Sequence, residues 1–412
     1  MSELYRRMVL ITVPLVLVVC ALVLTFRGGH SRTVFEMTND LGPVAQSLYF
    51  HHNLNLTFEG GPFVGPVVFH SARMPIPPAF LAISYRVFGD RLKAIYVFKT
   101  CLFLLPLILS MWLAYSRASR EWLAVGLLIA PFFIPNFLLQ ITSMQIEEGF
   151  YYGFLALATA ILIFVDRPLR SSWLLAFAVS LMALYLCKSS LRFVCIPLLI
   201  LACLRIANWT PRVALIGVVA ITMLSWGLYQ KTVSGRFTIG SSLDGLNLHK
   251  GNYAEFLQRY PPSDNGYIDR WDGSLNPVHA FSSEWQFNDY HWRIGERFIK
   301  NHKGATVKAD LVKLDIYWLG LRDIGSGHFH DVFTRVDFVN MALMRLILLV
   351  SLVLALYCMF RVSPLKFAAT ATLVIFASVC FPYLVGFALT RHASVLIYPA
   401  ALFLTRVLAV QS

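Results

Sequence analysis

Few acidic residues lie next to the apolar runs of this chain, and three that do are candidates for catalysis. Glu147 and Glu148 lie side by side in ITSMQIEEGFYYG, between two long apolar runs, and Asp40 follows the first such run. Two separated carboxylates that face one cavity can divide acid–base work, because one accepts a proton while the other orients a nucleophile or a metal ion. The alternative is structural: Glu147 and Glu148 would cap one helix, and Asp40 would cap another. The sequence leaves both interpretations open.

Basic residues at breaks between other apolar runs are candidates for binding an anion. Lys188 and Arg192 stand close together in LCKSSLRF, and Arg391 and His392 open the final apolar run in GFALTRHASVLIYP. Such groups bind phosphate through charge-assisted hydrogen bonds. The competing interpretation is that they extend toward lipid headgroups near helix ends.

Composition places these residues in a membrane protein. The chain has 412 residues, of which 57% are hydrophobic and 14% charged, outside the usual range of soluble domains. A helix needs about 20 mostly apolar residues to cross a membrane, and the sequence offers about ten such stretches. They are 8–26, 94–114, 122–140, 149–165, 172–187, 191–204, 213–229, 341–360, 367–387 and 393–410. The fifth and sixth are short enough to form one broken hairpin instead. Lys99 and Arg345, inside two of the spans, are expected to reach toward lipid headgroups.

The distribution of Lys and Arg predicts a cytoplasmic N-terminus, because basic residues in short loops resist translocation. Segments 27–93 and 230–340 then lie outside and form a polar layer over the bundle. The net charge of +13 is assigned to the inner face and to contact with lipid headgroups, with no nucleic-acid partner. We divide the chain into a bundle of residues 1–229, an external region of residues 230–340 and C-terminal spans in residues 341–412.

Both outer segments contain amphipathic patterns. In the first, PPAFLAISYRVFGDRLKAIYVF begins with prolines suited to a helix start and predicts a helix that lies on the membrane surface. In the second, SEWQFNDYHWRIGERFIKNHKGATVKADLVKLDIYWLGL predicts two amphipathic helices that are broken near Lys303 and Gly304.

Signals for metal and nucleotide binding are weak. His328, His330 and Asp331 in GHFHD, and the pair His51 and His52, could ligate a divalent ion, but neither spacing is a recognised signature. The alternative is that they are surface histidines. No nucleotide fingerprint is present, so no nucleotide cofactor is expected. The seven cysteines fall in apolar segments and predict no disulfide framework.

Taken in order, these features resemble the polyprenyl-phosphate-sugar-dependent glycosyltransferases of the GT-C fold, which include protein O-mannosyltransferases and the lipid A aminoarabinose transferase. The resemblance is spread over most of the chain and begins with Asp40 after the first span. It continues in ARMPIPPAFLAISYRVFGDRLKAIYVFK, APFFIPNFLLQITSMQIEEGFYYGFLAL, LYLCKSSLRFVCIPLLILACL, GLNLHKGNYAEF and RHASVLIYPAALFL. One departure is that many relatives place two acids together after the first span, whereas here Asn39 precedes a lone Asp40.

The resemblance implies an all-α, GT-C-like bundle that transfers a sugar from a polyprenyl-phosphate donor, with inversion at the anomeric carbon. The acceptor would be a glycolipid, a glycan or a protein at the periplasmic face of a bacterial inner membrane. Asp40 would be the general base, and Glu147 or Glu148 would orient the acceptor or hold a divalent ion. Fixed cations would stabilise the phosphate leaving group. The candidates are Lys188, Arg192, Arg391, His392 and Arg73.

Two other classes of protein are considered. A transporter or flippase for lipid-linked sugars is disfavoured, because the polar residues gather on one side of the membrane and no inverted repeat is visible. Another enzyme of the external face, such as a glycan polymerase or an acyltransferase, is the third possibility. An acyltransferase would be favoured by a His–acid pair within a span, which this sequence lacks.

Overall fold

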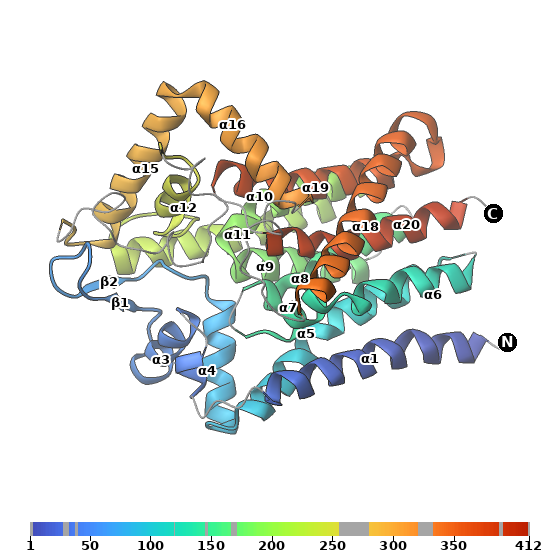
Figure 1. The fold of residues 1–412 in the computed structure, drawn as a ribbon, viewed down its shortest axis with the longest axis horizontal. Helices are drawn as coiled ribbons and strands as arrows, with labels where there is room; N and C mark the ends of the chain where they lie inside the picture. The colour runs from blue at the N-terminus through green and yellow to red at the C-terminus, as the bar shows by residue number, and fades with distance from the viewer. Residues whose placement is uncertain are drawn as a thin grey trace.

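Most of the chain is described by a computed structural model, which shows a helical bundle with a layer of polar segments at one end (Figure 1). The residues that it describes are 3–27, 33–37, 40–118, 120–144, 147–165, 171–254, 280–319, 333–386 and 390–410.

Apolar helices make up the bundle. Within the described residues, six helical segments are long and apolar enough to cross a membrane, so the chain is a mainly helical, polytopic membrane protein. Five of these segments correspond to the long helices α1 (Glu3–Arg27), α5 (Leu92–Tyr115), α11 (Trp209–Ser234), α18 (Phe333–Arg361) and α19 (Lys366–Val385). The sixth, His392–Val410, combines part of a 3-10 helix (Thr390–Leu396) with α20 (Ile397–Val410). The shorter apolar helices are α6 (Glu121–Ile129), α7 (Pro135–Thr142), α8 (Glu148–Phe164), α9 (Ser171–Cys187) and α10 (Arg192–Cys203). The predicted count of about ten spans is not confirmed, because each shorter helix falls below the roughly 20 residues that a span needs.

Prolines explain one difference from the predicted spans. The stretch 122–140 was predicted to be one helix, but α6 ends at Ile129 and α7 begins at Pro135, with a 3-10 turn between them. Pro131 and Pro135 lack an amide hydrogen, and their rings clash with the preceding turn of a helix. The apolar run is therefore divided before it reaches Glu147.

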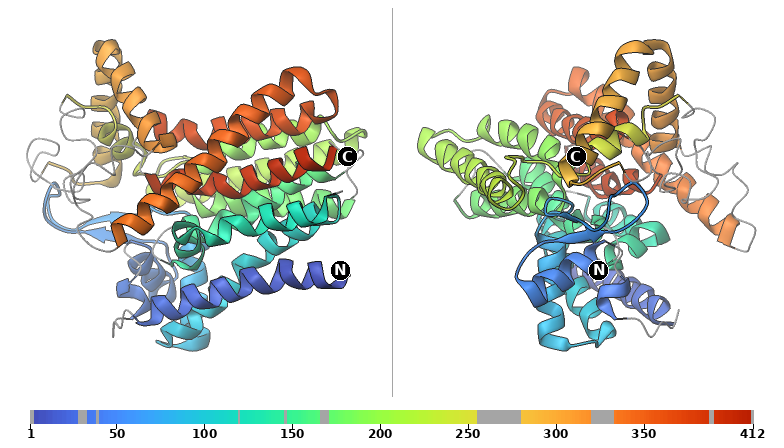
Figure 2. Two further views of the ribbon diagram at one scale, coloured as in Figure 1. Left: turned by 45° about the vertical axis from the view of Figure 1, so that its right-hand side comes forward. Right: turned by 90° about the vertical axis from the view of Figure 1, so that its left-hand side faces the viewer.

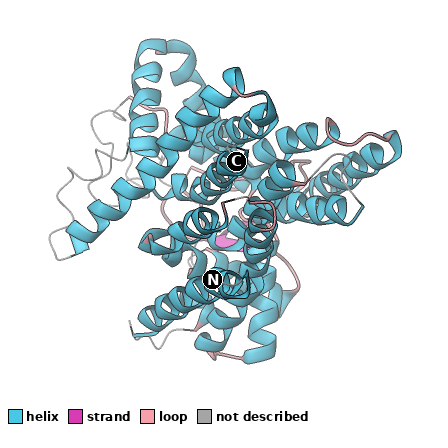
Figure 3. Ribbon diagram, turned by 90° about the vertical axis from the view of Figure 1, so that its right-hand side faces the viewer, coloured by secondary structure: helices cyan, strands magenta, loops and turns pink. Residues whose placement is uncertain are grey.

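Helix α8 is the centre of the bundle. Every one of its residues except Phe154 is buried, and it packs against α5, α9, α19 and α20. Its N-terminus points toward the polar layer, whereas both chain termini lie at the opposite end of the bundle (Figures 1 and 3).

The polar layer is built from the two segments that were predicted to lie outside. From the first come α2 (Val34–Met37), α3 (Leu41–His51), β1 (Leu56–Phe58), β2 (Val67–Phe69) and α4 (Ile76–Phe88). From the second come α12 (Asp244–Lys250), α15 (Glu284–Asn301) and α16 (Lys303–Leu314). Helices α15 and α16 confirm the two predicted amphipathic helices and meet at His302. Figure 2 shows this layer covering one end of the bundle.

Two features of the layer differ from the prediction. Strands β1 and β2 form an antiparallel hairpin, in which Thr57 pairs with Val68, that the sequence analysis did not predict. The surface helix was predicted to run from the prolines to Phe98, but α4 ends before Gly89, whose φ of +61° suits a glycine, and α5 starts a new direction.

Contacts join the two outer segments to each other. Phe63, in the hairpin loop, forms a backbone bridge to Phe281, before α15. The Glu284 carboxylate accepts hydrogen bonds from the backbone amides of His70 and Ser71, at 3.1 and 3.2 Å. Burial raises the pKa of Glu284, while these amide donors lower it. The hairpin and α15 are therefore fastened together just before Arg73.

Lys99 and Arg345 do not reach toward headgroups as predicted. Lys99 is 0% exposed and Arg345 is 5% exposed. Each donates a hydrogen bond to a backbone carbonyl, Lys99 to Ile141 and Arg345 to Tyr317. The expectation was wrong because backbone carbonyl groups inside the bundle accept hydrogen bonds from both side chains.

Candidate functional site

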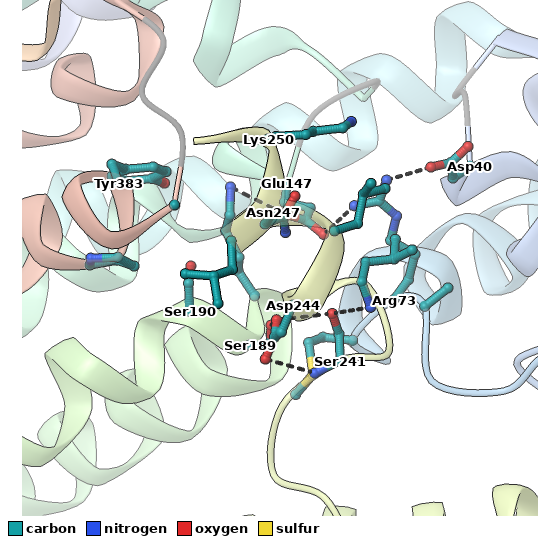
Figure 4. A pocket seen from close by; sticks show the side chains of 18 of the residues that line it. Asp40, Arg73, Glu147, Ser189, Ser190, Ser241, Asp244, Asn247, Lys250 and Tyr383 are labelled. Atoms are coloured by element: carbon teal, nitrogen blue, oxygen red, sulfur yellow. Dashed lines mark hydrogen bonds and ion pairs between the residues drawn. The ribbon is translucent and has the colours of Figure 1, made fainter. Parts of the chain in front are cut away.

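A cavity of about 740 Å³ lies between the bundle and the polar layer. Elements from both halves of the chain line it, among them the α7–α8 junction, the α9–α10 junction, α12 and the end of α19. Seven of the eight candidate residues from the sequence line this one cavity, and several are drawn in Figure 4: Asp40, Arg73, Glu147, Glu148, Lys188, Arg192 and His392. The side chain of Arg391 lies outside the part of the chain that the structure describes.

Glu147 and Glu148 enter the cavity from the break between α7 and α8. Lys188, at the break between α9 and α10, approaches both: its Nζ lies 2.7 Å from Glu148 Oε1 and 3.3 Å from Glu147 Oε2. The Glu148 side chain is only 3% exposed, and a carboxylate so deeply buried requires a paired cation. Lys188 supplies that pairing from a different helix break.

Arg73 extends the set of ion pairs toward Asp40. Its Nη2 lies 2.5 Å from Asp40 Oδ2, and its Nη1 lies 3.2 Å from Glu147 Oε1. Asp40, Arg73, Glu147, Lys188 and Glu148 thus form a continuous series of alternating charges, which we call the charge chain. Its three carboxylates exceed its two cations by one, so the charge chain carries a net charge of −1 when all five groups are ionised.

Electrostatics keep both cations of the charge chain protonated. Burial alone would lower the pKa of Arg73, but Glu147 and Asp40 raise it above its ordinary value. Burial likewise opposes the charge on Lys188, and Glu148 leads the groups that raise its pKa above the ordinary value. The two cations are therefore fixed charges in the cavity wall.

The geometry distinguishes the two interpretations of the acids. Asp40 occupies the N-cap position of α3 and Glu147 that of α8, yet neither side chain makes a capping hydrogen bond. Both carboxylates pair with Arg73 instead. The Asp40 side chain is the most accessible of the three acids, at 39% exposed. Asp40 and Glu147 therefore stand at helix starts but pair with Arg73 and make no capping hydrogen bonds.

A second ionic cluster lies on the α12 side of the cavity. Arg192 Nη2 lies 3.0 Å from Asp244 Oδ2, and Arg192 Nη1 donates to the Ser189 carbonyl oxygen at 3.2 Å. The Ser241 hydroxyl donates to Asp244 Oδ1 at 3.2 Å. A Cβ added at Gly240 would clash with Asp244 Oδ2 and lie 2.9 Å from Arg192 Nη1. We call this cluster the Arg192–Asp244 pair. The close packing of both side chains against the backbone requires glycine at position 240.

Aromatic contacts place His392 at the third side of the cavity. Its ring stacks on that of Tyr383, with centroids 4.0 Å apart and an interplanar angle of 19°. The Lys188 ammonium lies 5.8 Å from the Tyr383 ring centroid. Tyr383 thus connects His392 to the charge chain.

No relative identifies the site. Comparisons of the chain with protein-family models, with curated proteins and with solved structures each returned no match. The resemblance to GT-C glycosyltransferases stays a prediction, and the function has to be argued from the geometry.

Sequence reasoning missed several residues that line the cavity. Asp244, Asn247 and Lys250 come from α12, Ser190 from the α9–α10 break, and Tyr383 from the end of α19. Asn247 and Lys250 lie within GLNLHKGNYAEF, and Asp244 directly precedes this segment. Asp244 belongs to the long segment 230–340 and not to the edge of an apolar run, so its charge does not stand out in the sequence.

The described residues show no cluster of side chains typical of a metal site. They contain no group of three or more His, Cys, Asp or Glu side chains that could hold one. An ion bound by the carboxylates of the charge chain would have to displace Arg73 or Lys188. His51 and His52 are exposed at the end of α3. The GHFHD group, His328, His330 and Asp331, lies outside the described residues.

Proposed function

We propose that the protein is a membrane glycosyltransferase that moves a sugar from a polyprenyl-phosphate donor to a glycolipid, glycan or protein acceptor. The cavity would open to the periplasm of a bacterial inner membrane, with the N-terminus in the cytoplasm, as the Lys and Arg pattern favours. The observation that carries the proposal is the convergence of Asp40, the Glu147–Glu148 pair and fixed cations in one cavity. That set combines a base with stabilisers of negative charge.

Asp40 is the proposed general base. Its carboxylate is the most accessible of the charge chain, and one of its oxygens is held by Arg73. A base must lie within hydrogen-bond reach of the proton that it removes, and the exposed side of Asp40 offers that access. Glu147 and Glu148, which are less exposed, would orient the acceptor.

The cations suit the charge that develops on the donor. When the acceptor oxygen attacks the anomeric carbon, the bond from that carbon to the phosphate oxygen breaks. The acceptor proton passes to Asp40, and the leaving phosphodiester becomes a monoester with one additional negative charge. Arg192, Lys188 and His392 line the cavity and would stabilise this charge more in the transition state than in the bound donor.

The size of the cavity supports a headgroup-sized ligand. Its volume of about 740 Å³ falls within the roughly 300–1,000 Å³ of small-ligand sites. Phe193 and Phe381, whose ring centroids are 5.3 Å apart, line it at the ends of α10 and α19. A sugar phosphate would occupy the polar part, with the prenyl chain in the surrounding lipid.

The test is sugar transfer in proteoliposomes with a radiolabelled polyprenyl-phosphate sugar and an envelope lipid extract as acceptor. Wild-type protein is expected to label the acceptor, and Asp40→Asn to lose this activity while it folds normally. Asp289→Asn is the control, because Asp289 is an exposed acid that pairs with Arg236 in the polar layer. Turnover by Asp40→Asn at the wild-type rate would contradict the assignment of the base. Mass spectrometry of envelope glycolipids from a deletion strain would identify the sugar and the acceptor.

A further inference from the structure

The buried lysine of α5 lies directly behind the acids of the cavity. Lys99 does not line the cavity, and its ammonium is 0% exposed. It donates to the carbonyl oxygen of Ile141, in the last turn of α7. It also lies 5.1 Å from the ring centroid of Phe150, in the first turn of α8. Lys99 therefore contacts both helices at the junction that carries Glu147 and Glu148.

The C-terminal end of α7 needs a hydrogen-bond donor, and Lys99 lies where it can provide one. The last four carbonyl groups of a helix have no partner within it, and the C-terminal end carries a partial negative charge. Such an end is costly inside a membrane, where no water can hydrogen-bond to it. The Lys99 side chain supplies a hydrogen-bond donor to the end of α7.

Gly149 shows how closely the three parts of the junction pack. A Cβ at this position would clash with the Ser143 carbonyl oxygen and lie 2.7 Å from both Lys99 Nζ and the Gln140 carbonyl oxygen. The ammonium, the end of α7 and the start of α8 thus meet around one glycine, which directly follows Glu148.

We infer that Lys99 is a positioning residue, which fixes the α7–α8 junction so that Glu147 and Glu148 meet Arg73 and Lys188 in the cavity. It acts through the backbone at the end of α7 and does not touch a substrate. Its effect on transfer depends on the proposed function, whereas its effect on the orientation of the two glutamates does not.

Three variants separate positioning from general stability. Lys99→Met removes the ammonium and keeps an unbranched side chain of similar length. Gly149→Ala places a methyl group against the Lys99 ammonium and the end of α7. Gly153→Ala is the matched control: it adds the same methyl group to α8 one turn deeper, where a Cβ would lie 2.6 Å from the Phe103 carbonyl oxygen.

The first measurement needs no substrate. The purified protein is treated with a water-soluble carbodiimide and glycine amide, and mass spectrometry gives the labelling rate of each carboxylate. In wild-type protein, Glu148 is expected to react much more slowly than the more exposed Asp40. Lys99→Met and Gly149→Ala should raise the labelling of Glu147 and Glu148 several-fold and leave Asp289 unchanged. Gly153→Ala should raise it less, because its methyl group meets the backbone of α5 and not the end of α7. If Lys99→Met does not fold, Gly149→Ala carries the test. Wild-type labelling in every folded variant would overturn the inference.

The second measurement separates this inference from the proposed function. In the transfer assay, Lys99→Met should lower kcat by roughly 10- to 100-fold, because small misplacement of reacting groups costs about that much. The KM for the donor should change less than twofold. If labelling changes as expected but wild-type protein transfers no sugar, the positioning role stands and the proposed function fails. If wild-type protein transfers sugar but labelling and kcat are unchanged by Lys99→Met, the positioning role fails alone.

Discussion

The two ionic clusters of the cavity are assembled in different ways. The charge chain draws its members from four separated places in the sequence and holds three carboxylates against two cations. The Arg192–Asp244 pair is one acid and one base, supported by the neighbouring Ser189 and Ser241. An excess of carboxylate suits proton transfer, whereas a guanidinium held by one carboxylate keeps further donors for an anion. Under the proposed function, acid–base work falls to the charge chain and phosphate binding falls mainly to Arg192, with Lys188 shared between the two.

The largest expected effect comes from removing the cation that the two glutamates share. Lys188→Met leaves the Glu148 carboxylate buried without its cation, which should cost about 3–5 kcal/mol of unfolding free energy and abolish transfer. Arg192→Met should cost less, because Asp244 keeps its hydrogen bonds to Ser241. Thermal unfolding in detergent measures both. The double variant Lys188→Met/Glu148→Gln should recover much of the stability; no recovery would show that the pair is not coupled.

A smaller effect is expected when Asp244, the acid on α12, is replaced. Asp244→Asn should release Arg192 and raise the KM for the donor roughly tenfold, a change of about 1.4 kcal/mol, with kcat nearly unchanged. Asp40→Asn should do the reverse and lower kcat by about 10²- to 10⁴-fold. Steady-state kinetics of the two variants would decide. Equal kcat losses in both would contradict the division between the two sides.

A methyl group added at Gly240 should raise the KM for the donor, as is expected of Asp244→Asn. The added methyl group of Gly240→Ala would push Asp244 and Arg192 apart, so the KM for the donor should rise by several-fold. Gly217→Ala is the control, since a Cβ there meets nothing within 4 Å. Donor titration of the initial rate measures the effect. An unchanged KM in Gly240→Ala would mean that Arg192 does not bind the donor.

The smallest expected effect concerns pH and the support of α12. His249 on α12 and the fully buried His291 on α15 bring their Nδ1 atoms within 2.7 Å. Burial lowers the pKa of His291 to about 3, helped by His249 and Lys250. The unfolded chain therefore binds more protons than the folded one between pH 6.5 and about 3, and stability falls as pH drops through this window, by at most roughly 1.4 kcal/mol for each pH unit.

Thermal unfolding at pH 7.5 and 5.5 checks this dependence. The melting temperature of wild-type protein should fall at the lower pH, and His291→Asn should reduce the fall. An identical pH response in the two proteins would remove His291 from the explanation.

Some of this architecture could be predicted from the sequence, and the reasons are local. The amphipathic periodicity of α15 and α16 survives in the structure because each helix buries one face. Phe287 and His291 are buried on α15, and Ala309 and Val312 are buried on α16. Pro131 and Pro135 break the helix between α6 and α7. This break was not predicted, because the apolar run continues without interruption across both prolines. The hairpin was missed because strands β1 and β2 are three residues each, too short for a periodic signal.

The candidate site was only half predictable for a related reason. Asp40, Glu147 and Lys188 stand out because a charge beside a membrane span is costly and therefore rare. Their pairing is set by tertiary contacts between segments far apart in the sequence, and no spacing encodes it. Asp244 carried no such contrast, since it lies within the long segment 230–340 and not beside an apolar run. Lys99 was misinterpreted because a single apolar helix does not reveal a neighbouring helix end that needs a donor.

The fastening between the hairpin and α15 has a mechanical consequence. The Glu284 carboxylate accepts hydrogen bonds from the backbone amides of His70 and Ser71. Ser71 lies two residues before Arg73, which bridges Asp40 and Glu147. A displacement of α15 would therefore be transmitted through this short stretch of backbone to the Arg73 guanidinium. Under the proposed function, an acceptor that moved α15 on binding would also move the groups that hold Asp40 and Glu147 in place.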